Sequence, residues 1–333
     1  MKSAHVVVPD LFLPSALAKE VCADLALPAL EKVLARSTSQ TLKSNSLDAW
    51  LCQAFEVPAI APVTLLADGL APETGYWLRA DLVLLNLNRS QVILQTNVTI
   101  DLIEAQQLCA SINEYFSDMG MRFFAPHPTR WYLRLDNEPD LFTHSLYQVE
   151  GRDSHGYLPQ GASSLKWHGV MNEVQMFLNG HPIIKSLAER GAVAPSSIWL
   201  WGGGRGKMLS KPYDKIYGNS ELGQSFAQAA KIPSSINYHS DEGVERALYV
   251  WEGMSVALRR GDFYAWRESA LDFEKSCLNP LLQMLVVGEF GQITLDVLAE
   301  EASRRFVLNR PMLWKFWRRV KPLMNTKSAH SPS

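Results

Sequence analysis

Residues 198–207 read Ile-Trp-Leu-Trp-Gly-Gly-Gly-Arg-Gly-Lys, and the interpretation of the whole chain starts from this stretch. Four bulky apolar residues in a row predict a buried strand. A strand that leads into glycines and cations can present N–H groups and positive charge to a phosphate. The stretch matches neither a dinucleotide fingerprint nor a P-loop, because Lys207 stands at the third glycine of the first and Met208 at the Ser/Thr of the second. A tight connection without a ligand is the alternative.

Predicted strands and helices alternate on both sides of this stretch. Short apolar or alternating runs typical of strands occur at 4–8, 63–67, 76–87, 91–95, 122–125 and 130–135. Apolar residues follow helical spacing at 105–116, 167–178 and 261–285. Asp101 and Glu104 form a capping-box pattern before the first of these helices, and Pro280 is expected to kink the last. Hairpin-like strands in mid-chain predict an α/β core with an inserted α+β domain.

Arginine suits bidentate recognition of phosphate and carboxylate. Four arginines lie at predicted strands or strand ends, where a solvated charge is unusual: Arg79, Arg130, Arg134 and Arg205. Each alone could pair with a structural carboxylate, but together with the glycine stretch they predict an anion site. A second polar group lies on one face of the helix at 167–178, either as a pocket wall or as packing against a neighbouring element: His168, Asn172 and Gln175.

The composition is that of a globular protein. The 333 residues are 47% hydrophobic and 20% charged, which excludes a disordered chain and a collagen-like chain. Four scattered cysteines without a CxxC pair argue against structural zinc and a disulfide scaffold, and indicate a reducing compartment. Pro9-Asp10 ends the first apolar run after three valines, so we expect no signal peptide and predict a cytoplasmic location. Neither G-x-S-x-G nor H-E-x-x-H occurs.

The charge distribution is uneven. The net charge is −2, yet the chain from residue 302 onward carries eight basic residues and no acidic one. Within it, residues 314–319 read Trp-Lys-Phe-Trp-Arg-Arg. One interpretation is an amphipathic helix held on the acidic body by its tryptophans. The other is a segment, residues 302–321, that reaches a nucleic acid or a membrane surface.

The order of these motifs resembles the archaeal-type cofactor-independent phosphoglycerate mutases of the alkaline phosphatase superfamily, over roughly residues 57–285. The resemblance is carried by 77–82, 122–126, 130–133, 151–161, 181–182 and 198–205. The whole chain is still more similar to RpfE-type regulatory proteins, a divergent branch of that family. The resemblance implies an alkaline-phosphatase-like doubly wound core from residues 1–62 and 199–322, an inserted α+β substrate-recognition-like domain at 63–198, and a disordered tail at 323–333.

The resemblance also implies site residues, and it breaks at the catalytic ones. The residues that match the substrate-recognition pattern are Arg79, Arg130, His181, Gly202, Gly203, Gly204 and Arg205. The family's nucleophile segment falls on Val57-Pro58-Ala59, which has no hydroxyl group, and its metal segment falls on 249–260. Asp10 is the candidate metal ligand that remains. Phosphoryl transfer needs a nucleophile in line and cations against the developing charge.

Three functional hypotheses follow. The leading one is a catalytically silent protein, without a cofactor, that binds a small phosphorylated or carboxylated metabolite or a protein partner in a regulatory role; Trp251 would then fill the former metal site. The second is an active phosphoglycerate mutase or phosphotransferase that binds Mn²⁺ or Zn²⁺ through Asp10, Asp68, Asp241 or Glu242. The third is an interaction module that uses the basic C-terminal segment.

Overall fold

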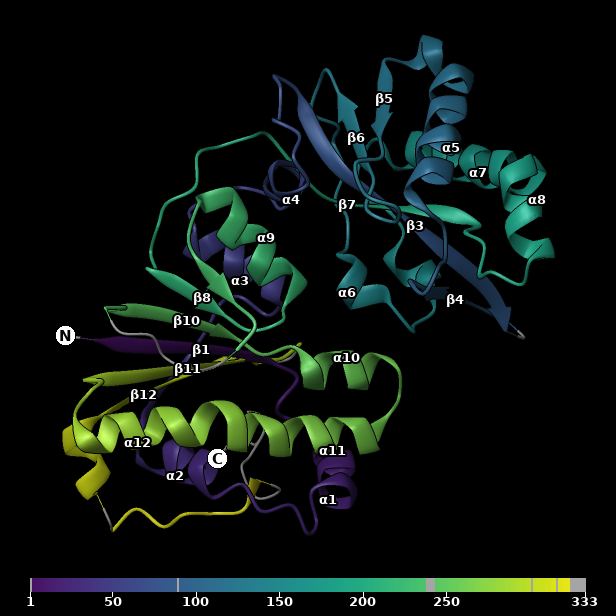
Figure 1. Cartoon of the computed structure of the whole chain (residues 1–333). Coiled ribbons are helices and arrows are strands. Elements are labelled where there is room, and N and C mark those ends of the chain that lie inside the picture. Colours follow the sequence, from purple (N-terminus) through teal and green to yellow (C-terminus); the bar gives the residue numbers. More distant parts are fainter. Residues whose placement is uncertain (1, 89, 238–242, 301, 316, 324–333) are drawn as a thin grey trace. The chain divides into compact units, whose positions relative to one another are not determined.

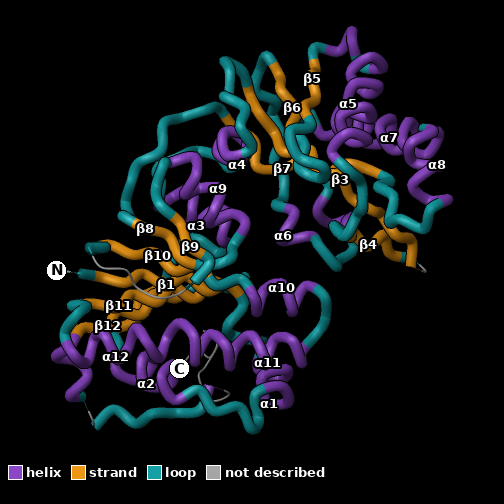
Figure 2. Tube along the Cα trace, in the orientation of Figure 1, coloured by secondary structure: helices purple, strands orange, loops and turns teal. Residues whose placement is uncertain are grey.

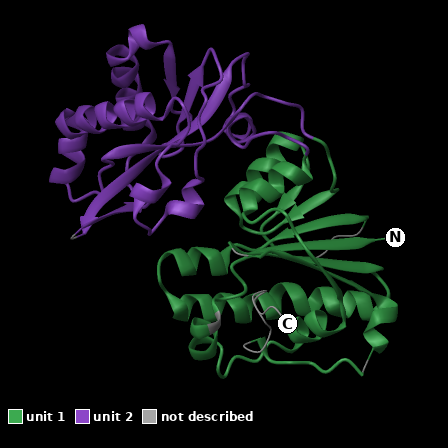
Figure 3. Cartoon of the chain, turned by 180° about the vertical axis from the view of Figure 1, so that it is seen from behind, with its two compact units in different colours: residues 1–55, 210–333 green, residues 56–209 purple. Residues whose placement is uncertain are grey.

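The computed structural model describes residues 2–88, 90–237, 243–300, 302–315 and 317–323. The chain forms two compact units (Figure 3). Unit 1 comprises residues 1–55 and 210–333, and unit 2 comprises residues 56–209. The boundary expected at residue 199 is therefore wrong, because strand β7 (Ser197–Gly204) pairs with β3 (Tyr76–Asn88) and belongs to unit 2. The tail expected to be disordered lies outside the described residues, apart from the buried Leu323.

Unit 1 is built on a seven-stranded sheet in the order β2-β12-β11-β1-β10-β8-β9. Its parallel strands are β1 (Ser3–Pro9), β8 (Lys215–Tyr217), β9 (Ser234–Ser235), β10 (Arg246–Val250) and β11 (Gln292–Leu298). Antiparallel β12 (Arg304–Asn309) and β2 (Thr38–Thr41) complete one edge. The central strand β1 is a nearly continuous apolar run because both faces of a parallel sheet are covered.

Helices cover both faces of this sheet (Figures 1 and 2). They are α1 (Ser15–Val21), α2 (Pro28–Arg36), α3 (Leu47–Ala54), α9 (Glu221–Ala230), α10 (Gly253–Arg259), α11 (Phe263–Asp272) and α12 (Asn279–Val287). The helix expected at 261–285 is present, but its irregularity is the π-helical segment Phe273–Leu278 that precedes Pro280. Proline occupies the first turn of α12, where its missing N–H is tolerated.

Unit 2 contains an antiparallel sheet in the order β4-β3-β6-β5. Strand β7 lies outside this order and also pairs with β3. The remaining strands are β4 (Gln91–Gln95), β5 (Met121–Phe124) and β6 (Tyr132–Leu135). Its helices are α4 (Ala61–Ala67), α5 (Leu102–Tyr115), α6 (Leu146–Val149), α7 (Ser164–Gly180) and α8 (Pro182–Glu189). The strand expected at 63–67 is helix α4, because Pro62 starts a helix there and the Thr64 hydroxyl donates to the Ile60 carbonyl.

Several local predictions are confirmed in unit 2. Strands β3 and β4 pair antiparallel as the predicted hairpin, and Asp101 and Glu104 form both bonds of the capping box at the start of α5. The mainly parallel sheet of unit 1 and the antiparallel sheet of unit 2 give the α/β fold with an α+β insertion that the sequence predicts.

Candidate functional site

The glycine stretch is part of strand β7 and packs tightly on its own unit. A Cβ atom at Gly202 would overlap the Ile60 side chain, and one at Gly204 would overlap Ala59. At Gly203 it would lie 2.5 Å from the Tyr76 hydroxyl oxygen. The glycines are thus needed for close packing of β7.

A cavity of about 480 Å³ opens where β7 ends. It is lined by Leu66, Pro72, Glu73, Thr74, Gly75, Arg205, Gly206, Lys207 and Met208. The Arg205 side chain is exposed, and the Lys207 ammonium donates to the Glu56 carbonyl oxygen at 2.7 Å. The lining therefore includes two cationic side chains, Arg205 and Lys207, and one acidic side chain, Glu73. We call this cavity the Arg205 pocket.

Arg79 is buried and bound to a carboxylate of the same strand. Its side chain is 3% exposed, and its Nη2 and Nε donate to Asp81 Oδ1 at 2.6 and 3.1 Å. The Trp201 indole donates to the other oxygen of Asp81 at 2.5 Å. The guanidinium lies 5.1 Å from the ring centroid of Trp201 and 5.6 Å from that of Tyr132. Its Nη1 is buried without a hydrogen-bond partner in the described residues.

Arg130 is bound to Asp68 in the same part of unit 2. Its Nη2 and Nε donate to the two Asp68 oxygens at 2.5 and 3.1 Å, and the Tyr132 hydroxyl donates to Asp68 at 2.5 Å. Burial raises the pKa of Asp68, but the hydrogen bonds from Arg130 and Tyr132 outweigh it and hold this pKa below its usual value. Asp68 is therefore an ionised partner of Arg130, and its oxygens are committed to that role rather than to a metal.

The structure thus brings Arg79 and Arg130 into one cluster but neutralises both. Tyr132 contacts both the Arg79 guanidinium and Asp68, and each arginine has its own carboxylate. A neutralised pair offers little net attraction to an incoming anion. The Arg79–Asp81 pair was readable in the sequence, because residues two apart on a strand share a face. The Arg130–Asp68 pair joins residues 62 positions apart and has no local signal.

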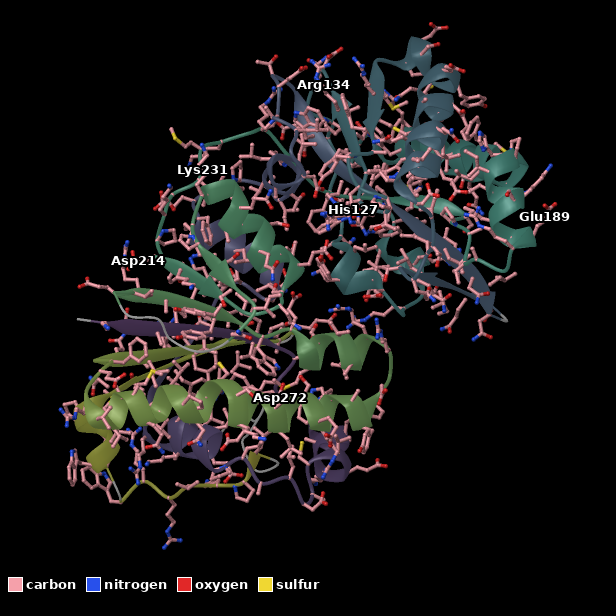
Figure 4. The ribbon with its side chains drawn as sticks, in the orientation of Figure 1. His127, Arg134, Glu189, Asp214, Lys231 and Asp272 are labelled. Atoms are coloured by element: carbon pink, nitrogen blue, oxygen red, sulfur yellow. The ribbon has the colours of Figure 1, made fainter. Side chains whose placement is uncertain are left out.

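His181 lies at the α7–α8 junction and acts as a helix cap. Its Nδ1 accepts from the Ile183 N–H at 3.3 Å, and its ring packs 5.3 Å from Phe177. Burial lowers the pKa of His181. Arg134, labelled in Figure 4, donates to the Thr74 carbonyl oxygen at 3.0 Å. These contacts of His181 and Arg134 do not link either side chain to Arg79.

The polar face predicted on α7 divides into two parts. Asn172 and Gln175 line a cavity of about 810 Å³ together with Asn179. His168 instead hydrogen-bonds to the Pro159 carbonyl oxygen at 2.8 Å. Both interpretations of this face, pocket wall and packing, therefore hold for different residues.

Apolar bulk occupies the carboxyl ends of β1 and β10, where the resemblance placed metal ligands. Asp10 has a φ of 58°, and its carbonyl oxygen accepts from the Trp266 indole at 2.9 Å. Trp251 is buried, packs 5.4 Å from Phe273 and donates to the Ser269 hydroxyl at 3.0 Å.

Two carboxyl groups near this end of the sheet were missed by the sequence analysis. Glu252 follows β10 and hydrogen-bonds to Ser220, and Asp48 lies in the first turn of α3. Burial raises the pKa of both groups. Asp48 Oδ1 is buried without a hydrogen-bond partner in the described part of the chain.

Two carboxyl groups do not complete a zinc site, which takes three or four protein ligands. No group of three or more His, Cys, Asp or Glu able to hold a metal occurs among the described residues. Asp241 and Glu242, two of the proposed ligands, lie outside those residues.

A buried polar network in unit 1 was also missed. Asp296 is fully buried and accepts from His5 Nε2 at 2.9 Å and Trp50 Nε1 at 2.8 Å. Arg305 donates to both Asp296 oxygens at 2.7 and 2.6 Å, and the Tyr213 hydroxyl bonds to His5 Nδ1 at 2.8 Å. Burial raises the pKa of Asp296, but the bonds from Arg305 and His5 bring it to about 2. The network joins five segments of unit 1, one for each of its residues.

Comparison with known proteins supports the fold. The chain is similar in structure to a cofactor-independent phosphoglycerate mutase from Thermoplasma acidophilum, with a TM-score of 0.50 and 12% identity over 99% of this chain and 96% of that one. It is similar to the PH0037 protein of Pyrococcus horikoshii, with a TM-score of 0.52 and 11% identity over 92% and 87%. The chain therefore has a phosphoglycerate-mutase-like fold of the alkaline-phosphatase-like class.

One curated relative matches in sequence. A probable 2,3-bisphosphoglycerate-independent phosphoglycerate mutase from Geobacter sulfurreducens is 32% identical over 70 residues, which is 21% of this chain and 18% of the relative. The match thus spans less than a fifth of the relative's length. No family model matches the chain. No helix among the described residues has both the length and the apolar character needed to span a membrane.

Proposed function

We propose that this phosphoglycerate-mutase-like protein binds a small phosphorylated or carboxylated metabolite in the Arg205 pocket and does not transfer a phosphoryl group. The observation that carries the proposal is the juxtaposition of Arg205 and Lys207 around a cavity of about 480 Å³. Because Arg79 and Arg130 are neutralised by Asp81 and Asp68, the attraction for an anion comes from this pocket instead.

The chemistry of the pocket suits an anion. The guanidinium of Arg205 is exposed and can present a planar fork to a phosphate or carboxylate. Lys207 uses one N–H for the Glu56 carbonyl, and an ammonium group has two more to donate. Charge-assisted bonds of this kind contribute about 1.5–3 kcal/mol each. Glu73, which also lines the Arg205 pocket, disfavours ligands of very high negative charge.

Catalytic silence is supported by what occupies the carboxyl end of β10. Trp251 is part of the apolar core there, and Arg259 Nη1 donates to the Ser255 hydroxyl at 2.7 Å. A tryptophan and an arginine supply no metal ligand. The regulatory role belongs to the same proposal and rests on the resemblance to RpfE-type proteins: a protein that binds a metabolite without consuming it can report its concentration.

Calorimetric titration with 3-phosphoglycerate tests the binding half. We expect saturable binding that weakens about tenfold or more in Arg205→Ala and in Lys207→Ala, since each loses a charge-assisted bond. Arg122→Ala, an exposed arginine of β5, is the matched control and should bind like the parent. Absence of binding at millimolar ligand, or equal binding by Arg205→Ala and Arg122→Ala, would contradict the proposal.

An activity assay tests the catalytic half. The purified chain is supplied with Mn²⁺ or Zn²⁺, and conversion of 3-phosphoglycerate to 2-phosphoglycerate is followed. We expect no turnover above that of the metal alone. Turnover that disappears in Asp10→Asn would show that the rearranged-ligand alternative is correct, and it would leave the binding result independent.

A further inference from the structure

The last described segment of the chain is held on unit 1 by methionine and leucine side chains. A 3₁₀ turn, Arg310–Trp314, follows β12, and its Met312 and Leu313 pack against the core of unit 1. Further along, Leu323 is 5% exposed. The Arg318 guanidinium donates to the Ser37 carbonyl oxygen at 2.8 Å. The segment is therefore a docked part of the fold.

The tryptophans of this segment face outward. Trp314 is 74% exposed and Trp317 is 68% exposed. The expectation that they anchor the segment as an amphipathic helix is wrong, because Arg310–Trp314 form a 3₁₀ turn in which Met312 and Leu313 pack against the core and Trp314 is exposed. Other tryptophans of this chain, among them Trp77 and Trp201, are almost fully buried.

More exposed apolar side chains lie at the end of α12 (Asn279–Val287) on which this segment packs. The Arg310 guanidinium lies against Gly288, 2.9 Å from where a Cβ atom would stand, so the segment packs on the C-terminal end of α12. There Val286 is 41% and Val287 64% exposed. Figure 1 shows the yellow C-terminal segment at this end of α12.

The same segment is rich in basic residues. We define the α12–tail patch as Val286, Val287, Trp314 and Trp317 with the cations Arg310, Lys315, Arg318, Arg319 and Lys321. Residues 310–323 contain these five cations and no acidic residue. The patch therefore combines exposed indoles and aliphatic groups with a clear excess of positive charge, although the whole chain has a net charge of −2.

We propose that the α12–tail patch docks on the surface of an anionic lipid bilayer. Indole rings partition to the headgroup region, aliphatic side chains enter the acyl boundary, and lysine and arginine bind anionic headgroups. The exposed valines favour a membrane over a single-stranded nucleic acid, which is bound mainly by base stacking on aromatic side chains and by cations along the backbone. The chain would thus lie on a membrane rather than span it.

Co-sedimentation of the full chain with lipid vesicles tests the proposal. We expect binding to vesicles of phosphatidylcholine with 40% phosphatidylglycerol, and none to phosphatidylcholine alone. A basic side chain near an anionic surface contributes about fivefold to binding, so Arg319→Glu with Lys321→Glu should weaken it at least about 25-fold. Binding should also fall when the salt rises from about 0.1 M to 0.5 M, because the Debye length shrinks.

Matched variants separate the patch from general effects. Trp314→Ala with Trp317→Ala should lower vesicle binding at least about tenfold, whereas Tyr264→Ala, an aromatic residue that is also 74% exposed, should leave it unchanged. Lys185→Glu with Arg260→Glu repeats the charge change away from the patch. Equal loss in patch and control variants would overturn the proposal. So would absence of vesicle binding by the parent chain, or binding to a single-stranded 20-mer oligonucleotide without vesicle binding.

Discussion

Replacement of Asp296 by asparagine should destabilise unit 1 strongly. The carboxylate is fully buried and accepts from His5, Trp50 and Arg305, with both of its oxygens bonded to the Arg305 guanidinium. Asp296→Asn keeps the shape but removes the charge, and it turns an amide NH₂ toward donors. Breaking a buried ion pair from one side costs about 3–5 kcal/mol, and we expect a loss of that size at pH 7.

The pH dependence of stability gives a second value for the free energy that the Asp296 carboxylate contributes to folding. The pKa of Asp296 is about 2 in the folded chain against a usual 3.8, which corresponds to about 2 kcal/mol of stability. Because the folded-state pKa is the lower one, this stabilisation is fully present above about pH 4 and is lost as the pH falls toward 2. The parent chain should therefore approach Asp296→Asn in stability over that interval.

Urea unfolding followed by tryptophan fluorescence measures both quantities. Asp214→Asn is the matched control, because Asp214 (labelled in Figure 4) forms a partly exposed pair with Arg246 at 2.9 Å in the same unit. Exposed pairs contribute about 0–1 kcal/mol. The reasoning is refuted if Asp296→Asn costs no more than Asp214→Asn, or if the gap between parent and variant stays constant from pH 5 to pH 2.

Three further predictions concern packing and burial. Arg79→Met should lose about 3–5 kcal/mol in thermal or urea unfolding, since Asp81 would stay buried without its partner; an unchanged midpoint would contradict the ion pair. Gly204→Ala should cost about 1–3 kcal/mol through overlap with Ala59, whereas Gly169→Ala in α7, with no atom within 4 Å of its Cβ position, should be neutral or stabilising. Burial raises the pKa of the Cys52 and Cys109 thiols to about 12 and also raises the pKa of the Cys22 and Cys277 thiols. Thiol reagents at pH 8 should therefore label the chain quickly only after urea is added. Rapid labelling of the native chain would rule this out.

The contrast between α4 and β7 shows where a local pattern is sufficient. Residues 198–201 are apolar and followed by glycines, and they form the expected strand. Residues 63–67 are largely apolar too but form a helix, because Pro62 starts it and a run of five residues cannot distinguish the two structures. The capping box at Asp101 was predictable because all of its atoms lie within four residues.

The site residues divide in the same way. The sequence placed arginines on strands and left open whether they bind an anion or a carboxylate of the chain. Only the tertiary structure decided this for Arg130, whose partner Asp68 is 62 residues away. It likewise showed that Arg205 and Lys207 share a cavity with residues 72–75.

What the sequence determined by itself is therefore the short-range part: the strands and helices with strong periodicity, the caps, the uneven charge and the family-like order of motifs. The tertiary structure decided which charges are neutralised and which tryptophans are buried. Asp296 meets His5 across 291 residues, and Trp314 is exposed because Met312 and Leu313 take its expected place in the core. Such pairings depend on packing between distant segments, and no local pattern records them.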